Sequence, residues 1–348
     1  MKIAQIAPLA ESVPPRLYGG TERVVSYLTD ELVRLGHDVT LFASADSQTS
    51  ARLVACAPRA LRLDARVHDA LPHHLLMLER VRAHAAEFDV LHFHVEHLHL
   101  PLFRPLAAKT VTTLHGRLDL PDLVPLYSEF DDMPLVSISD SQRRPLPDAR
   151  WIATVYHGLA AGVCPFNPAP RGNYLAFLGR VSPEKGLDRA VAIARRAGLR
   201  LRIAAKIERG PDERHWRERI APLIDGEIIE FIGELDEAQK PAFLGNATAL
   251  LFPIDWPEPF GLAMIEAMSC GTPVIAWPNG SVPEVVDPGV TGLVVGSVEE
   301  AAAAVAQAAT LDRERVRLRF EERFSAARMA RDYLSVYRTL RTRKQVAA

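Results

Sequence analysis

The stretch 249–284 constrains the fold most strongly, because it reads as one complete strand–loop–helix–strand unit. Its first four residues, ALLF, form a short apolar run that Pro253 ends, which is typical of a buried strand. The prolines that follow predict a turn, and Pro259 can occupy the first turn of a helix, where its missing N–H costs nothing. The pattern predicts a helix that starts at Gly261, and residues 272–276 then form a second buried strand.

This unit carries two carboxylates, Glu258 at the start of the predicted helix and Glu266 about two turns further in. One explanation needs no ligand, since one glutamate can interact with the helix dipole while the other is solvated. The alternative is that a polyhydroxylated or cationic ligand binds at the helix entrance. The segment alone leaves both explanations open.

Residues 2–43 show the same alternation of strands and helices. An apolar strand at 2–7 is followed by a long loop that ends in YGGTE, and then by a helix that stops at Gly36. The two loop glycines, Gly19 and Gly20, let backbone N–H groups approach an anion or a sugar hydroxyl closely, with a flexible loop tip as the alternative. Because the spacing is not GxGxxG, nothing here favours a dinucleotide-binding site.

Another predicted strand, at residues 110–114, ends in His115 and Gly116. Ligands of open α/β sheets bind outside the carboxyl ends of the strands. A role for His115 in facing a ligand is therefore favoured over that of a satisfied core histidine.

The most histidine-rich segment, residues 89–99, covers a predicted strand and the loop after it. Histidines two apart with a glutamate nearby can bind zinc. Since there is no HExxH spacing and no cysteine partner, a polar role at the strand end is favoured over a metal site for His92, His94, His97 and His99.

Two segments rich in basic residues raise the question of a lipid surface. Residues 51–88 contain helical patterns, and the amphipathic run 75–86 is favoured as a solvated surface helix over one that lies on anionic lipid. Residues 311–348 hold eleven Arg or Lys against five Asp or Glu, with apolar residues at helical spacing. A terminal helix that packs back on the first domain is the preferred interpretation, and lipid or acidic partners come second.

Residues 156–173 contain prolines and glycines without a period, which indicates an interdomain linker. After it the strand–helix alternation starts again, so we predict two doubly wound α/β domains that face each other across a cleft. The predicted boundaries are 1–156 for the first domain, 157–172 for the linker, 173–324 for the second domain and 325–348 for the terminal helix.

Two cations, Arg180 and Lys185, follow the first strand of the second domain. Arg offers a planar fork and Lys a point charge, a pairing that suits a diphosphate, although two surface cations are the simpler alternative. The helix predicted from Gly261 would direct its positive end to the same region, which favours the anion site.

Composition excludes several classes of protein. The 348 residues carry a formal net charge of −2, so a nucleic-acid binder is not expected. The three cysteines are far apart and form no CxxC, which predicts neither a disulfide framework nor structural zinc. Since no apolar run reaches about 18 residues, we expect a cytoplasmic protein, with a weak peripheral membrane contact left open.

Several of these motifs together resemble those of the retaining nucleotide-sugar glycosyltransferases of family 4, which have the GT-B architecture of two Rossmann-like domains. The E-x7-E segment from Glu258 to Glu266 carries the resemblance most specifically. The other matching segments are Gly280-Ser-Val-Pro-Glu-Val-Val286, Gly292-Leu-Val, Gly179-Arg180…Glu184-Lys185-Gly186 and Tyr18-Gly19-Gly20-Thr21-Glu22. The similarity spans nearly the whole chain.

The resemblance implies roles for individual residues. Glu266 would bind the ribose of the donor and Glu258 the transferred sugar, while Arg180 and Lys185 would hold the diphosphate. His115 would lie on the reaction side of the sugar, so the implied catalytic set is His115, Arg180, Lys185 and Glu258. The other implied donor-binding positions are Gly233, Glu234 and Leu235 beside the base, the N–H groups of Phe260, Gly261 and Leu262 at the sugar, and Gly19 and Gly20 in the first domain.

The reaction expected from this resemblance is transfer of a sugar from a nucleotide-diphosphate sugar to an acceptor hydroxyl with retention of configuration. Cations and a helix terminus would stabilise the leaving diphosphate, so we expect no cofactor and no metal, in keeping with the absence of a DxD motif. No carboxylate of the first domain stands out as a nucleophile, which favours front-face attack.

A UDP-sugar such as UDP-glucose is the favoured donor. No sequence motif identifies the acceptor, which is a sugar, a lipid-linked sugar or a small molecule. The alternatives are a nucleotide-sugar epimerase of the same shape, a GDP-mannose-dependent mannosyltransferase, a silent nucleotide-sugar sensor and a hydrolase that uses a metal at the histidines.

Overall fold

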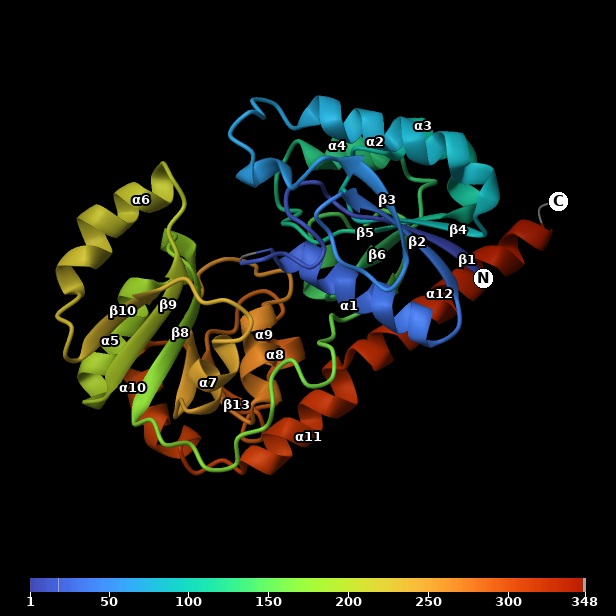
Figure 1. The fold of residues 1–348 in the computed structure, drawn as a ribbon. Helices are drawn as coiled ribbons and strands as arrows, with labels where there is room; N and C mark the ends of the chain where they lie inside the picture. Colours follow the sequence, from blue (N-terminus) through green and yellow to red (C-terminus); the bar gives the residue numbers. More distant parts are fainter. Residues whose placement is uncertain (18, 347–348) are drawn as a thin grey trace. The chain divides into compact units, whose positions relative to one another are not determined.

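The computed structural model describes residues 1–17 and 19–346, so that Tyr18 of the glycine motif and residues 347–348 of the predicted terminal helix lie outside the described residues. The chain divides into two compact units (Figure 1). Unit 1 comprises Met1–Ala160 and the C-terminal helix α12 (Ala326–Val346), and unit 2 is Ala161–Ser325.

In the described part of unit 1, a seven-stranded parallel sheet has the order β3-β2-β1-β4-β5-β6-β7. The order reverses between β1 and β4, so this is a doubly wound sheet with a switch point between these strands. Its strands are β1 (Lys2–Ile6), β2 (Asp38–Ser44), β3 (Arg52–Ala57), β4 (Val90–Phe93), β5 (Thr110–Thr113), β6 (Leu135–Ser137) and β7 (Trp151–Thr154). The helices that accompany it include α1 (Gly20–Arg34), α2 (Leu71–His84), α3 (Leu100–Phe103) and α4 (Leu123–Glu129).

The central strands of unit 1 are buried on both faces, as is usual for parallel sheets. All four residues of β4 and of β5 are buried. The helix α12 covers part of this sheet, and its side chains Tyr333 and Tyr337 are fully buried, with their hydroxyls on Thr113 and His92 at 2.8 Å. Figure 1 shows α12 running beside α1 in this unit.

Unit 2, all of which the structure describes, holds a six-stranded parallel sheet of order β10-β9-β8-β11-β12-β13. Its switch point lies between β8 and β11, which pair through Ala249 and Leu175. The strands are β8 (Tyr174–Arg180), β9 (Arg200–Lys206), β10 (Ile229–Gly233), β11 (Ala249–Phe252), β12 (Val274–Ala276) and β13 (Gly292–Val294). The helices are α5 (Leu187–Ala197), α6 (Pro211–His215), α7 (Lys240–Gly245), α8 (Leu262–Ser269), α9 (Val282–Val285), α10 (Val298–Ala308) and α11 (Arg313–Phe324).

The predicted α/β class is confirmed, and three local details differ from the prediction. The sequence prediction does not include β3, an edge strand whose partly exposed residues break the apolar pattern that marks the other strands. Helix α8 starts at Leu262, one residue after the predicted start at Gly261, because Gly261 adopts the left-handed conformation and is the N-cap of the helix. The sequence pattern predicts one helix over residues 236–246, whereas α7 covers only Lys240–Gly245, because Asp236 and Gln239 form a separate turn ahead of it.

Among the helices of the described residues, none combines the length and the apolar character needed to cross a membrane.

Candidate active site

The switch point of unit 2 brings together the two loops that carry the predicted donor-binding residues. The loop after β8 contains Lys185, and the loop after the neighbouring strand β11 contains Glu258. The two loops are tied by the backbone N–H of Asp255, which donates to the carbonyl of Glu184 at 2.8 Å. Because parallel neighbours end at the same edge of a sheet, residues 73 positions apart meet here.

At this meeting point Lys185 and Glu258 form an ion pair, Nζ to Oε2. Both side chains are largely buried, at 16% and 11% exposure. Trp256 donates its indole N–H to the same carboxylate oxygen at 2.9 Å, and its ring lies under the Lys185 ammonium, 5.0 Å from the centroid. The carboxylate is thus held by two donors and the ammonium by a carboxylate and a π face, which is a compact, oriented charge pair.

The loop after β12 holds the backbone around Glu258 in place through hydrogen bonds. Ser281 donates its backbone N–H to the Glu258 carbonyl at 3.0 Å and its hydroxyl to the Phe260 carbonyl at 2.7 Å. Gly280 has a φ of 59°, and a Cβ there would lie 2.3 Å from the backbone nitrogen and oxygen of Glu258. Only a glycine allows this approach, which explains the GSVPE motif structurally.

The second glutamate of the motif is buried inside α8. Glu266 is 6% exposed at its side chain, and its Oε1 lies 3.0 Å from Nζ of Lys240. Lys240 also contacts Glu237 at 2.6 Å. A buried carboxylate is costly unless it is paired, and the contact with Lys240 offsets that cost at this position.

Arg180 does not stand as an isolated cation. Its guanidinium lies near three carboxylates, at 3.1 Å from Glu184, 3.5 Å from Glu208 and 3.1 Å from Asp212. Burial raises the pKa of Asp212, and the Arg180 charge lowers it in opposition. An anion that binds Arg180 must therefore compete with acidic side chains, whereas Lys185 has one carboxylate partner that a ligand can replace.

Gly233 is the last residue of the edge strand β10, two strands away from β8, and Glu234 and Leu235 follow it. Gly233 has a φ of 81°, and Glu234 is exposed. They lie at the same carboxyl edge of the sheet as Lys185.

The remaining predicted positions belong to unit 1. Gly19 is the N-cap of α1 and Gly20 is its first residue, and a Cβ on Gly19 would lie 2.7 Å from Pro15. His115 follows β5 at the carboxyl edge, where its Nε2 lies 2.9 Å from Nδ1 of His94. Its Nδ1 is buried and has no hydrogen-bond partner in the described part of the chain.

The other histidines of the rich segment fill hydrogen-bonded core positions. His92 lies between the hydroxyls of Tyr337 and Thr113, both at 2.8 Å, and His99 contacts the Thr112 hydroxyl at 2.7 Å. His97 is half-buried. Within residues 1–17 and 19–346 no group of three or more His, Cys, Asp or Glu has an arrangement that could hold a metal ion.

The sequence reasoning missed four residues that complete these clusters, namely Trp256, Lys240, Asp212 and Gln5. The sequence could have indicated Lys240, because it precedes a proline at the start of a helix, where the helix dipole disfavours a cation that has no anionic partner. The others come from chain positions that only the folded structure brings together.

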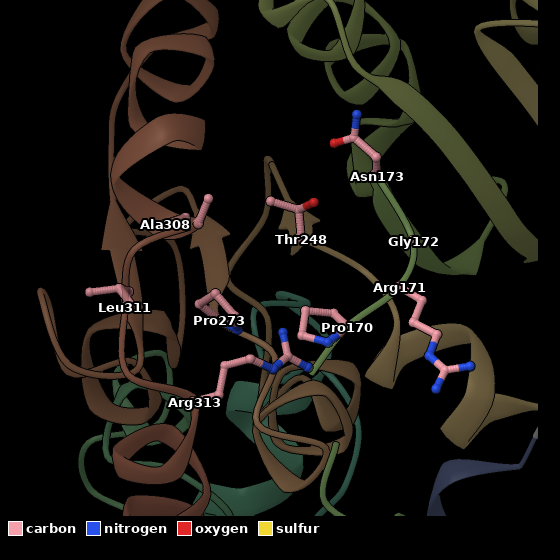
Figure 2. Close-up of a pocket in the computed structure, with 10 residues that line it drawn as sticks. Pro170, Arg171, Gly172, Asn173, Thr248, Pro273, Ala308, Leu311 and Arg313 are labelled. Atoms are coloured by element: carbon pink, nitrogen blue, oxygen red, sulfur yellow. The ribbon is translucent and has the colours of Figure 1, made fainter. Parts of the chain in front are cut away.

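A pocket of about 280 Å³ in unit 2 lies away from this site (Figure 2). Its lining residues Asn173, Thr248 and Pro273 immediately precede β8, β11 and β12, so it opens at the amino ends of these strands. Figure 2 shows Arg313 beside it, and this side chain is occupied by the carbonyls of residues 167, 245 and 247. The pocket is therefore on the wrong edge of the sheet for the predicted donor.

Comparison with known proteins defines first the class of this protein. AviGT4, a glycosyltransferase involved in avilamycin A biosynthesis, has a TM-score of 0.73 and 26% identity, with 98% of each chain covered. The structure of Anabaena Alr3699/HepE in complex with UDP-glucose has a TM-score of 0.74 at 16% identity, and covers 97% of this chain and 100% of its own. The fold is that of the GT-B glycosyltransferases.

The sequence comparisons then give the family. The model described as Glycosyl transferases group 1 matches residues 166–323, and that described as Glycosyltransferase Family 4 matches residues 18–180. The phosphatidyl-myo-inositol mannosyltransferase of Mycobacterium leprae (strain TN) is 27% identical over 381 aligned residues, with 98% of both chains covered. Both family models and the full-length similarity to a mannosyltransferase support a glycosyltransferase of the family 4 type, and the predicted family, fold class and enzyme class are confirmed.

Proposed function

We propose that this enzyme transfers a hexose from a nucleotide-diphosphate sugar to an acceptor hydroxyl, with retention of configuration and without a metal ion. The observation that carries the proposal is the Lys185–Glu258 pair at the switch point of unit 2, directly before the N-terminus of α8.

The pair suits a donor that is anionic at one end and polyhydroxylated at the other. A diphosphate oxygen can take the place of the Glu258 carboxylate on Lys185, which strengthens the ion pair because the diphosphate carries more charge. Glu258 is then available to accept hydrogen bonds from sugar hydroxyls. The first N–H groups of α8 lack partners within the helix and add a positive potential at the same place.

The buried pair Glu266–Lys240 is proposed to bind the ribose of the donor. Lys240 engages Oε1 of Glu266, which fixes the direction of the carboxylate. A carboxylate oriented in this way can accept both ribose hydroxyls, and it distinguishes a nucleotide from a simple sugar phosphate.

The proposed reaction is a front-face displacement. The bond between the sugar C1 and the phosphate oxygen breaks, the acceptor oxygen bonds to C1 on the same face, and the acceptor proton passes to an oxygen of the leaving diphosphate. Lys185 and the N-terminus of α8 stabilise the charge that develops on the diphosphate, a role that a metal ion plays in other transferases. Arg180 would assist once the donor displaces its carboxylate partners.

We favour UDP-glucose as donor, supported by the related fold of Anabaena Alr3699/HepE, whose complex contains it. A mannosyl donor such as GDP-mannose is the second candidate, and the full-length similarity to a mannosyltransferase favours it. A panel of UDP-, GDP- and ADP-sugars in a thermal-shift assay separates the two, because ligand at 100 times its Kd stabilises the folded state by about 2.7 kcal/mol.

The test of the mechanism is the Lys185→Ala variant. We expect kcat to fall about 100-fold or more, because a group that stabilises the leaving diphosphate acts mainly in the transition state. Arg195→Ala, an exposed arginine on α5, is the control and should leave kcat unchanged. A rise in KM at constant kcat would contradict the leaving-group role.

Two further measurements test the class of reaction. Activity that survives exhaustive treatment with a chelator is expected if no metal takes part. Incubation of the donor without acceptor should return the donor sugar unchanged, and an epimerised sugar would favour the epimerase instead.

A further inference from the structure

His115 has a ring nitrogen without a hydrogen-bond partner in the part of the chain that the structure describes. Its Nδ1 is buried without a hydrogen-bond partner among the described residues, while its Nε2 is held by His94. A buried polar atom without a partner costs free energy, so its presence at the carboxyl edge of the sheet of unit 1 calls for a ligand that completes its hydrogen bonding. Which kind of ligand depends on whether Nδ1 carries a proton.

The sheet brings the partners of His115 together at the switch point of unit 1. Gln5 on β1 lies directly opposite His92 on β4. His94 follows β4 by one residue and lies with its Nε2 2.8 Å from Oε1 of Gln5. The chain of contacts therefore runs from Gln5 through both nitrogens of His94 to His115.

The direction of the protons follows from the chemistry of each atom. The amide oxygen of Gln5 can only accept, so Nε2 of His94 must donate. A neutral histidine has one ring proton, which leaves Nδ1 of His94 as an acceptor. Nε2 of His115 must then donate to it, and Nδ1 of His115 is left with a free lone pair.

A second contact fixes the orientation of the Gln5 amide. Its Nε2 donates to the hydroxyl of Tyr337 on α12 at 3.1 Å, and that hydroxyl lies 2.8 Å from Nδ1 of His92. Tyr337 thereby uses the amide nitrogen and leaves the amide oxygen for His94. The terminal helix, far away in sequence, is thus part of the same network.

Other contacts fix the position of the His115 ring, in addition to the hydrogen bond that places its proton on Nε2. Oε1 of Glu96 accepts the backbone N–H groups of His115 at 2.9 Å and of Gly116 at 3.1 Å. His157 stacks on the ring with centroids 5.2 Å apart and planes 17° apart. Burial lowers the pKa of His115 to about 3, in agreement with a neutral ring.

We propose that Gln5 and His94 are positioning residues that hold His115 in the tautomer protonated on Nε2, so that its Nδ1 accepts a hydrogen bond from a hydroxyl group of the substrate. The inference rests on the proposed function only in assigning this hydroxyl to the sugar or acceptor of the transfer. A neutral acceptor nitrogen selects a hydroxyl and not a phosphate, because an ionised phosphate oxygen has no proton to donate and its lone pairs would face that of Nδ1.

The tautomer is measured directly in the free protein. In the enzyme labelled with ¹⁵N at histidine, the His115 resonances are assigned by their loss in His115→Gln. At neutral pH we expect a protonated Nε2 and a bare Nδ1 in two-bond ¹H–¹⁵N correlation spectra. A proton on Nδ1 would overturn the proposal.

Two variants test the cause. Gln5→Met removes the acceptor of His94, and Tyr337→Phe, a milder change, releases the Gln5 amide to rotate. Each should produce a second population of His115 with its proton on Nδ1. A His115 spectrum that stays as in the wild type in both variants contradicts the positioning role.

Kinetics then separate this inference from the proposed function. His94→Phe and His115→Phe should each lower kcat/KM, and the double variant should be no worse than His115→Phe alone. His99→Phe, a buried histidine outside the network, is the matched control and should retain wild-type kcat/KM. If the wild-type enzyme transfers sugar but the losses in kcat/KM of His94→Phe and His115→Phe add up in the double variant, this inference alone is overturned. If the spectra show His115 protonated on Nε2 but the protein transfers no sugar, the proposed function alone is overturned.

Discussion

At the scale of single residues, the site is built from charges that are already paired before a ligand binds. Lys185 faces Glu258, and Lys240 faces Glu266, with each side chain less than a fifth exposed. Pairing spares the enzyme the cost of unpaired buried charges and holds both glutamates in place. In the proposed mode of binding a donor would replace one of these contacts, and its affinity would then be a difference between two sets of interactions.

The Lys240→Met variant tests the value of the second pair. Removing the cation leaves Glu266 buried and uncompensated, so unit 2 should lose about 3 kcal/mol of unfolding free energy. The double variant Lys240→Met with Glu266→Gln should recover most of this stability in urea titrations. It should still bind the nucleotide weakly, and full recovery of nucleotide affinity would exclude Glu266 from the ribose site.

The motif residues could be predicted singly, but their partners could not. Glu258 and Glu266 stand out because two acids near one helix start are unusual. Trp256 and Asp212 carry no such signal, since their roles arise from distances across separate loops. For Arg180 the sequence indicates a cation at a strand end and cannot show that three carboxylates surround it.

At the scale of elements, the loops at the carboxyl edge of unit 2 hold one another in place. The loop after β12 contacts the backbone of the loop after β11, and that loop in turn contacts the one after β8. The sequence predicts most of the strands and places the start of α8 within one residue, but it does not show how these loops contact one another. Strands follow from runs of apolar residues, whereas the first turn of α8 depends on a left-handed Gly261 that neighbouring loops hold.

A pair of glycine substitutions measures the contact between these loops. Gly280 and Gly289 both have positive φ, 59° and 76°, but only Gly280 has backbone atoms where a Cβ would lie. Gly289→Ala should cost about 1 kcal/mol from backbone strain alone. Gly280→Ala should cost about 3 kcal/mol or more and weaken donor binding, because Glu258 must shift. Equal losses in chemical denaturation would show that the contact is unimportant.

At the scale of the whole molecule, the histidines are distributed unevenly. Of the twelve in the chain, His215 alone belongs to unit 2. In unit 1 burial lowers the pKa of His99 and His115 to about 3, and lowers the pKa of His92, His94 and His157 as well. The two units should therefore respond differently to acid.

The direction of this response follows from proton binding. A buried histidine stays neutral in the folded state while the unfolded chain protonates it below about pH 6.5, so the unfolded state binds more protons. The stabilisation is complete above about pH 6.5 and is lost as the pH falls toward 3. Each such histidine contributes up to about 1.4 kcal/mol per pH unit in that range.

We expect the urea midpoint of unit 1 to fall between pH 7 and 5.5, while that of unit 2 changes little. Fluorescence and circular dichroism at several pH values would follow the two transitions. His99→Phe should make the dependence of unit 1 shallower by about one proton. A midpoint of unit 1 that is independent of pH in this range would contradict the burial of these histidines.

The placement of α12 has a consequence for the order in which the protein is made. Gln5 and its partner Tyr337 are 332 positions apart. The hydrogen bond between them, which orients the network around His115, can therefore form only after α12 has been synthesised. Unit 2 consists of residues 161–325 alone, so its core can form before α12 is synthesised. Until α12 is present, the polar groups of the unit 1 sheet that Tyr337 contacts lack this partner. In a nascent chain truncated before residue 326, unit 2 should therefore resist protease while unit 1 is still cut, because unit 1 then lacks α12.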